Sequence, residues 1–157
     1  MTLKELRISL NLTIKDAADA ASVPLRTYNR YESDPSYGNN LKREMIKNIL
    51  KEKYEITETK GILTINQITV VCSTIFLKYK DKINFCYLFG SYAKGYAKDD
   101  SDVDLFIATS LSGIDFVGLI EELRESLHKK IDLIRFNDLE NKELLNEILK
   151  DGRKIYG

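Results

Sequence analysis

The stretch from 102 to 108, Asp-Val-Asp-Leu-Phe-Ile-Ala, constrains the fold more than any other segment. Side chains on a β strand alternate between its two faces. One face would be buried, and it would carry Val103, Leu105 and Ile107. Asp102 and Asp104 would then share the opposite face, about 7 Å apart at the backbone. At an effective dielectric constant of about 20, such a like-charge pair costs about 2–4 kcal/mol. A fold that keeps this pair needs a partner that offsets the repulsion.

A divalent cation is one such partner, because hard carboxylate oxygens are the ligands that Mg²⁺ prefers. Asp132 repeats the pattern inside a second apolar stretch, 131–136. If this strand lies beside 102–109, Asp132 completes a cluster of three carboxylates. The alternative is that Asp102 and Asp104 are strand-edge charges that only discourage aggregation. For Asp132 the alternative is an ion pair with a basic neighbour: Lys129, Lys130 or Arg135.

A glycine turn precedes the aspartates. Gly90 and Ser91 follow a predicted strand at 84–89, and a short helix is expected to begin within 91–97. A glycine at such a turn lets backbone N–H groups approach a phosphate, and the start of a helix favours an anion. Lys94 lies one turn further on. Metal ligands beside a phosphate-binding turn indicate a site for a metal–nucleotide complex.

The chain is predicted to form an α+β protein with two domains, residues 1–57 and 58–157. The first domain is expected to be all helical, with helices at 3–10, 13–21, 25–31 and 41–54. In the last of these, the residues expected to face inward are Leu41, Met45 and Ile49, with Ile46 as a further candidate. The second domain alternates helices with strands, which is typical of a small sheet covered by helices. Its expected elements are helices 64–79, 114–129 and 139–150, strands 84–89, 102–109 and 131–136, and an edge strand at 152–156.

Composition excludes several classes of function. The chain carries 24 basic and 24 acidic residues, and residues 1–57 hold 10 and 8 of them. Any binding of nucleic acid must therefore depend on local placement of charge.

No apolar run approaches the roughly 20 residues of a membrane span, and the first residues lack the apolar core of a signal peptide, so we expect a cytoplasmic protein. Cys72 and Cys86 are expected to be buried thiols, and a single histidine argues against a histidine metal site or a Ser-His-Asp triad.

The segment LFGSYAKGYAKDDSDVDLFI resembles the G-S-x10-D-x-D signature of the minimal nucleotidyltransferases, small relatives of the DNA polymerase β superfamily. The resemblance covers residues 64–157, and Lys94 stands where the family often has arginine. It implies a small mixed sheet flanked by helices. It also implies two Mg²⁺ ions on Asp102, Asp104 and Asp132, with the triphosphate of ATP or another NTP at Gly90 and Ser91.

The implied reaction is attack of an acceptor hydroxyl on the α-phosphorus of the NTP, with loss of pyrophosphate. Many members of this family pair with a HEPN-type toxin and act as antitoxins, some by adding AMP to a tyrosine of the toxin. A protein acceptor is favoured here, because the chain is short for an enzyme that modifies antibiotics. The alternative is a regulator or antitoxin that binds nucleotide or partner without turnover.

The segment LKELRISLNLTIKDAADAASVPLRTYNRYES resembles the Xre/Cro-type helix-turn-helix regulators. The resemblance implies that 25–31 is the recognition helix and that operator DNA is a partner, for which a homodimer would suit a palindromic site. The residues expected to contact DNA are Lys15, Arg26, Thr27, Asn29 and Arg30. The alternative is a four-helix module that docks protein or packs on the second domain.

Overall fold

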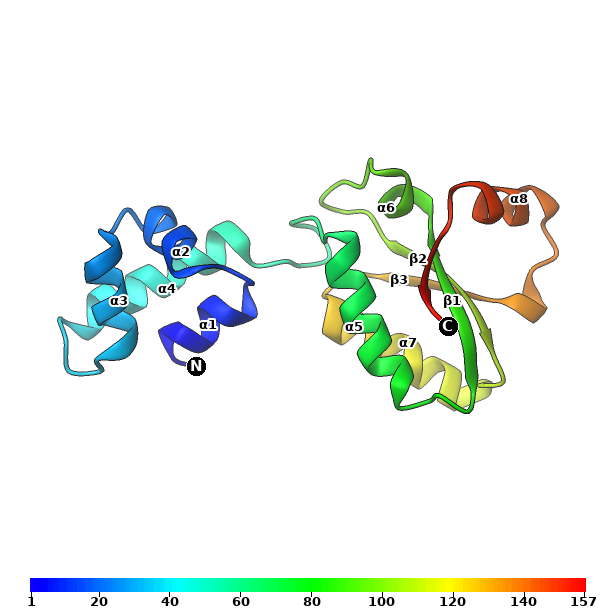
Figure 1. Ribbon diagram of the computed structural model, residues 1–157, viewed down its shortest axis with the longest axis horizontal. Helices are drawn as coiled ribbons and strands as arrows, with labels where there is room; N and C mark the ends of the chain where they lie inside the picture. The colour runs from blue at the N-terminus through cyan, green and yellow to red at the C-terminus, as the bar shows by residue number, and fades with distance from the viewer. The chain divides into compact units, whose positions relative to one another are not determined.

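Four helices make up the first of the two compact units, residues 1–55 and 56–157, into which the computed structural model of residues 1–157 divides. They are α1 (Leu3–Ser9), α2 (Ile14–Ala20), α3 (Leu25–Ser33) and α4 (Asn40–Tyr54) (Figure 1). Reciprocal capping boxes start the first two helices. Thr2 pairs with Glu5, and Thr13 pairs with Asp16.

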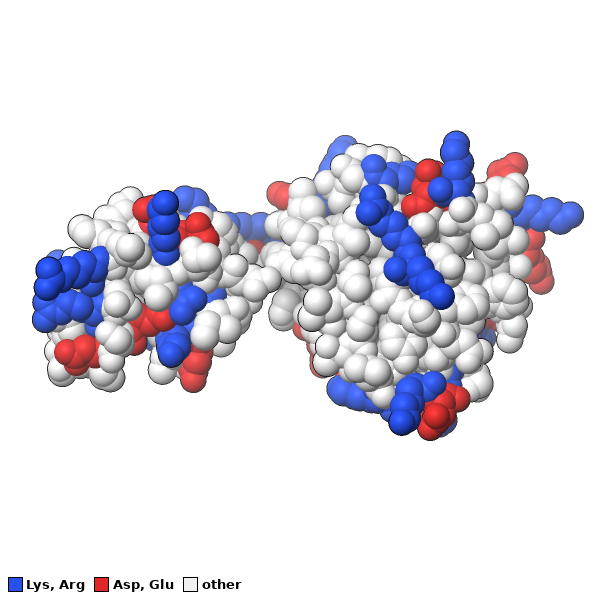
Figure 2. All heavy atoms as spheres, in the orientation of Figure 1, with Lys and Arg blue, Asp and Glu red and all other residues white.

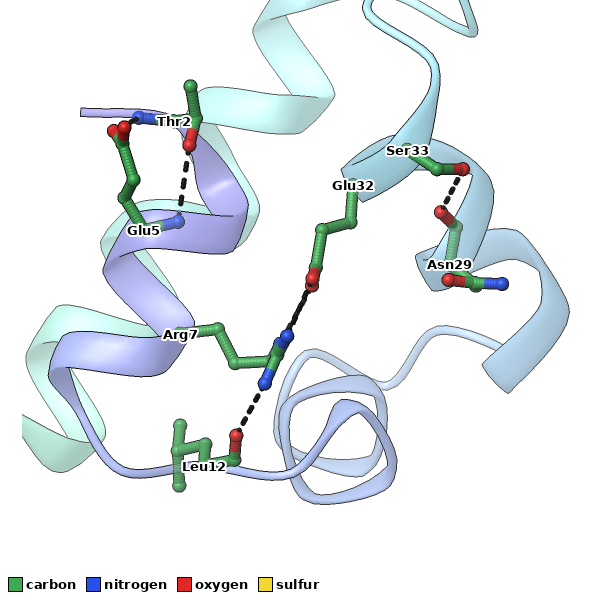
Figure 3. A network of polar contacts seen from close by, with 7 residues as sticks. All are labelled: Thr2, Glu5, Arg7, Leu12, Asn29, Glu32 and Ser33. Carbon is green, nitrogen blue, oxygen red and sulfur yellow. Dashed lines mark hydrogen bonds and ion pairs between the residues drawn. The ribbon is translucent and has the colours of Figure 1, made fainter.

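The core of this unit draws side chains from all four helices: Leu3, Leu6, Ala17, Ala18, Tyr28, Tyr31, Ile46 and Leu50. A buried ion pair ties α1 to α3, with the Arg7 guanidinium donating to both carboxylate oxygens of Glu32 at 2.7 and 2.8 Å (Figure 3). Arg7 also donates to the carbonyl of Leu12 in the turn between α1 and α2. One side chain therefore fixes three parts of the unit.

The expected inward face of α4 is wrong, except for its further candidate Ile46. Leu41, Met45 and Ile49 are exposed, at 69%, 55% and 37%, whereas Ile46 and Leu50 are buried. The helix has two apolar stripes that are both spaced at four residues, so its own sequence does not decide which stripe is buried. The packing of α4 against α1 and α2 decides it.

A four-stranded mixed sheet organises the second unit, in the order β3-β2-β1-β4. Its strands are β1 (Ile83–Phe89), β2 (Val103–Thr109), β3 (Ile131–Arg135) and β4 (Arg153–Tyr156). The central pair β1–β2 is antiparallel, β2–β3 is parallel, and β4 is antiparallel to β1 at one edge. The sheet therefore has the mixed character that the family resemblance implies.

Helices cover both faces of this sheet (Figure 1). The helical segments of the unit are α5 (Ile65–Leu77), α6 (Gly90–Lys94), α7 (Gly113–Leu127), the 3₁₀ turn η1 (Phe136–Asp138) and α8 (Lys142–Asp151). On one face α5 and α7 enclose the main core, which includes the expected buried side chains of β2 and both free cysteines. On the other face Ile148 of α8 packs with Phe89 and Phe106. None of the helices combines the length and the apolar character needed to cross a membrane.

Most element boundaries differ from the expected ones by one to three residues, and β2 starts at Val103, so Asp102 lies just before the strand and not in it. Two of the differences have a clear local cause. The third strand ends one residue earlier than expected, because Phe136 begins the 3₁₀ turn that the Arg135–Asp138 ion pair closes. The last helix starts at Lys142 rather than near 139, where the Asn141 side chain accepts from the first free N–H groups. Neither difference moves a predicted site residue.

Candidate active site

Two predicted carboxylates stand side by side in the sheet. Asp104 on β2 pairs in register with Asp132 on the parallel strand β3. Paired residues of neighbouring strands are about 4.8 Å apart and point to the same face. Asp102 immediately precedes β2, two residues before Asp104, and its charge acts on Asp104. The fold thus gathers all three predicted aspartates at one end of the β2–β3 pair.

The electrostatics of Asp104 reflect this grouping. Its side chain is half-buried, whereas Asp102 and Asp132 are exposed. Burial, followed by repulsion from Asp132, Asp102 and Glu147, raises the pKa of Asp104 from 3.8 to about 6. A carboxylate in such surroundings gains from any cation that binds beside it.

The predicted glycine turn lies against the same carboxylate. Gly90 follows Phe89, which pairs in register with Asp104, and has a left-handed φ of 70°. A Cβ at position 90 would lie 2.2 Å from Oδ2 of Asp104, so no other residue fits without moving that side chain. The five-residue helix α6 starts here and ends at Lys94, and its C-cap residue Gly95 also has a positive φ. The turn and the aspartates are therefore parts of one site.

Lys94 lies in the last turn of α6, one turn beyond Gly90 as its spacing predicts, and forms an ion pair. Its ammonium group lies 2.5 Å from a carboxylate oxygen of Glu147 on α8. This ion pair raises the pKa of Lys94. Glu147 is also one of the charges that act on Asp104. No sequence pattern points to Glu147, because 53 residues separate it from Lys94.

The donor chemistry of this site fits a hard divalent cation. Its acidic groups offer only carboxylate oxygens, and no basic side chain is among the charges that act on Asp104. No three His, Cys, Asp or Glu side chains lie close enough together in the structure to hold a metal ion as they stand. Asp102, Asp104 and Asp132 are the residues that would hold it.

Residues 72–157, which contain this site, match the family model described as polymerase beta, nucleotidyltransferase. The chain belongs to the polymerase beta nucleotidyltransferase family. Residues 3–52 match a helix-turn-helix model, so this nucleotidyltransferase carries an N-terminal helix-turn-helix unit.

Two relatives from Methanocaldococcus jannaschii are named as protein adenylyltransferases. MJ1379 is 33% identical over 79 residues, which are 48% of this chain and 79% of the relative. MJ0435 is 33% identical over 79 residues, covering 49% and 83%. Among solved structures, the nucleotidyltransferase is similar to a chain of a toxin–antitoxin complex with AMP-PNP. That match has a TM-score of 0.50 and 23% identity, and it covers 59% of this chain and 74% of the other, so it shows a shared fold.

The helical unit presents most of its predicted DNA-contacting residues to solvent. Lys15 on α2 is exposed, as are three residues of α3: Arg26, Asn29 and Arg30. Thr27 is partly buried. The Arg30 guanidinium lies over the ring of Tyr37, 4.2 Å from its centroid. Lys and Arg side chains gather over α3 on the face seen in Figure 2, although Leu25 at the start of this helix is 53% exposed.

Proposed function

We propose that this nucleotidyltransferase transfers AMP from ATP to a hydroxyl group of a partner protein. The observation that carries the proposal is the pairing of Asp104 with Asp132 directly beside the Gly90 turn. A site for nucleotidyl transfer needs acidic groups that bind a cation and backbone N–H donors that bind phosphate. Here the aspartates supply the first and the Gly90 turn supplies the second. The names of the curated relatives support protein as the class of acceptor.

Each predicted residue has a distinct part in this proposal. Asp102, Asp104 and Asp132 would hold two Mg²⁺ ions, which supply charge stabilisation to the attacking and leaving oxygens. Gly90 and Ser91 would bind the triphosphate through backbone N–H groups and the serine hydroxyl. Asp132 is the more exposed member of the register pair. It is therefore the better placed of the two to take the proton of the incoming hydroxyl.

Lys94 would reach the triphosphate only by exchanging Glu147 for a phosphate oxygen. A lysine ammonium is a point charge on a flexible stem and changes partner readily. The ion pair is partly exposed, with 26% and 34% of the two side chains accessible, so solvent screening keeps the cost of this exchange small. The Lys94–Glu147 ion pair is therefore compatible with phosphate binding by Lys94.

The partner is proposed to be a HEPN-type toxin, with a tyrosine hydroxyl as the acceptor. The similar solved chain belongs to a toxin–antitoxin complex, which supports this choice of partner. We further propose that the helix-turn-helix unit binds operator DNA as a homodimer and regulates its own operon. Both roles place the protein in the cytoplasm.

The test is transfer of label from ATP carrying ³²P at its α-phosphate, with Mg²⁺, to protein in an extract of the cells that express the chain. Asp102→Asn and Asp104→Asn are expected to remove the labelled band. Asp100→Asn, an exposed charge change in the preceding turn, is the matched control and should keep it. If no protein takes up label, or if both variants label as the parent does, a non-catalytic regulator that only binds nucleotide or partner is the better account.

A further inference from the structure

Lys129 is the one charged residue that the structure buries completely, with 0% of its surface exposed. It forms no ion pair, so it is not the partner of Asp132 that the sequence suggested as an alternative. Its ammonium group instead donates to two backbone carbonyls, those of Asp99 and, at 3.4 Å, Lys60. A buried charge is costly unless hydrogen bonds satisfy it, so this arrangement needs a reason.

One of the two carbonyls belongs to a segment that leads into the site, and the other belongs to a turn at the start of the unit. Asp99 lies in the turn of residues 98–102, which leads directly into β2 and carries Asp102. Lys60 closes a tight turn with Thr57 at the start of the unit. Lys129 itself stands three residues before Asp132. Its side chain thus connects the approach to β2 with the approach to β3.

Further bonds hold the same turn at its two ends. The N–H of Val103 donates to the carbonyl of Lys130 at 2.9 Å, which joins the start of β2 to the start of β3. Within the turn, Lys98 and Ser101 exchange two bonds of 2.8 and 3.0 Å. The middle of the turn has no other tether to β3 than the Lys129 ammonium. Removing that donor would free the segment that sets the direction of Asp102.

We propose that Lys129 is a positioning residue, whose buried ammonium fixes the 98–102 turn and so holds Asp102 immediately before β2, near Asp104. This inference rests on the proposed function, because the benefit of the fixed turn is that Asp102 stays within reach of a cation bound beside Asp104 and Asp132. Packing alone would be met by an apolar side chain of the same length. Two inward-pointing carbonyls require a donor that reaches both, and charge-assisted bonds to them are stronger than neutral ones.

The test compares Lys129→Met with Lys130→Met in the full chain. Lys130 is exposed, and its backbone carbonyl, which holds Val103, stays in place in the control. Hydrogen exchange followed by mass spectrometry should show that peptides over 98–102 lose protection in K129M only. Peptides over β1 should not change in either variant. Unchanged exchange at 98–102 in K129M would overturn the proposal.

Metal affinity separates positioning from a purely structural role. Binding of Mn²⁺ in the presence of a non-hydrolysable ATP analogue, measured from the free Mn²⁺ signal in electron paramagnetic resonance, should weaken by about 10- to 100-fold in K129M. Lys129→Arg keeps the charge and the donors and should retain most of the affinity. A K129M variant that loses only thermal stability, with its Mn²⁺ affinity intact, would overturn the proposal.

Two further outcomes are decisive. If K129M does not fold, Lys129→Gln takes its place in both measurements. The glutamine amide is still a hydrogen-bond donor, but the shorter side chain cannot reach both carbonyls. If the parent chain itself binds no Mn²⁺ with nucleotide, the proposed function fails. The exchange comparison would then still decide whether Lys129 fixes the turn.

Discussion

At the scale of single residues, Gly90 joins a backbone requirement to a steric one. Gly90 and Gly95 both have a positive φ, of 70° and 83°, but only at position 90 would a Cβ meet another side chain. Alanine at either position should cost about 1–2 kcal/mol of stability from the left-handed backbone alone. Gly90→Ala should in addition displace Asp104 and remove transfer activity.

Gly95→Ala is the matched control and should keep most of the activity. Thermal unfolding and the labelling assay, run on both variants, separate the two effects. Equal activity in the two variants would show that the contact with Asp104 is unimportant.

Asp104 should make the metal-free protein less stable as the pH rises. Its pKa is raised from 3.8 to about 6, so between these values the folded state binds more protons than the unfolded state. The stability gained from the protonated form is fully present below about pH 4 and is lost through pH 6. The pKa shift corresponds to a change of about 3 kcal/mol in the free energy of unfolding.

Asp104→Asn should flatten this part of the pH profile and stabilise the protein at pH 8, while abolishing activity. Urea unfolding of the parent and the variant at several pH values, without divalent cations, measures how stability depends on pH. A stability that changes equally with pH in parent and variant would contradict the assignment of the shift to Asp104.

At the scale of elements, most helices and strands could be predicted because their signals are local. Capping residues lie within four positions of each other, and the alternation in β2 needs only its own seven residues. Glu147 and the partners of Lys129 could not be predicted, since these contacts join residues 30 to 69 positions apart. The buried stripe of α4 was missed for a related reason, because the choice between its two stripes depends on other helices.

The Lys94–Glu147 ion pair joins the short helix α6 to α8 beside the site. Glu147→Gln should free Lys94, remove one negative charge near Asp104, and lower the KM for ATP by a few-fold. The stability change should stay within about 1 kcal/mol, because the pair is partly exposed.

Glu143→Gln, on the exposed part of the same helix, is the control and should leave the KM unchanged. Lys94→Met should raise the KM. Steady-state labelling rates over a range of ATP concentrations test all three variants. An unchanged KM in Lys94→Met would exclude Lys94 from phosphate binding.

At the scale of the whole molecule, two compact units of different chemistry lie on one chain, and family models match each of them separately. The sequence could indicate this division because helical periodicity gives way to alternating strands and helices after the first third. It could also indicate the candidate carboxylates, since the motif that holds two of them is continuous in the chain. A helix-turn-helix surface is less specific, because its candidate contacts on α2 and α3 are ordinary polar residues, most of them exposed.

DNA binding by the first unit should therefore be tested in the full chain by removing positive charge from α3. Arg26→Ala with Arg30→Ala should weaken binding to the upstream region of the chain's own gene. The slope of log affinity against log salt should also fall by about one for each phosphate group that the variant no longer neutralises.

Lys51→Ala with Lys53→Ala removes the same charge from the last turn of α4 and is the matched control. Gel shifts at several salt concentrations measure both pairs. If the two double variants weaken binding equally, net charge rather than α3 accounts for the affinity. The helical unit would then act through a protein surface, because a recognition helix that contributes nothing beyond its charge cannot select an operator.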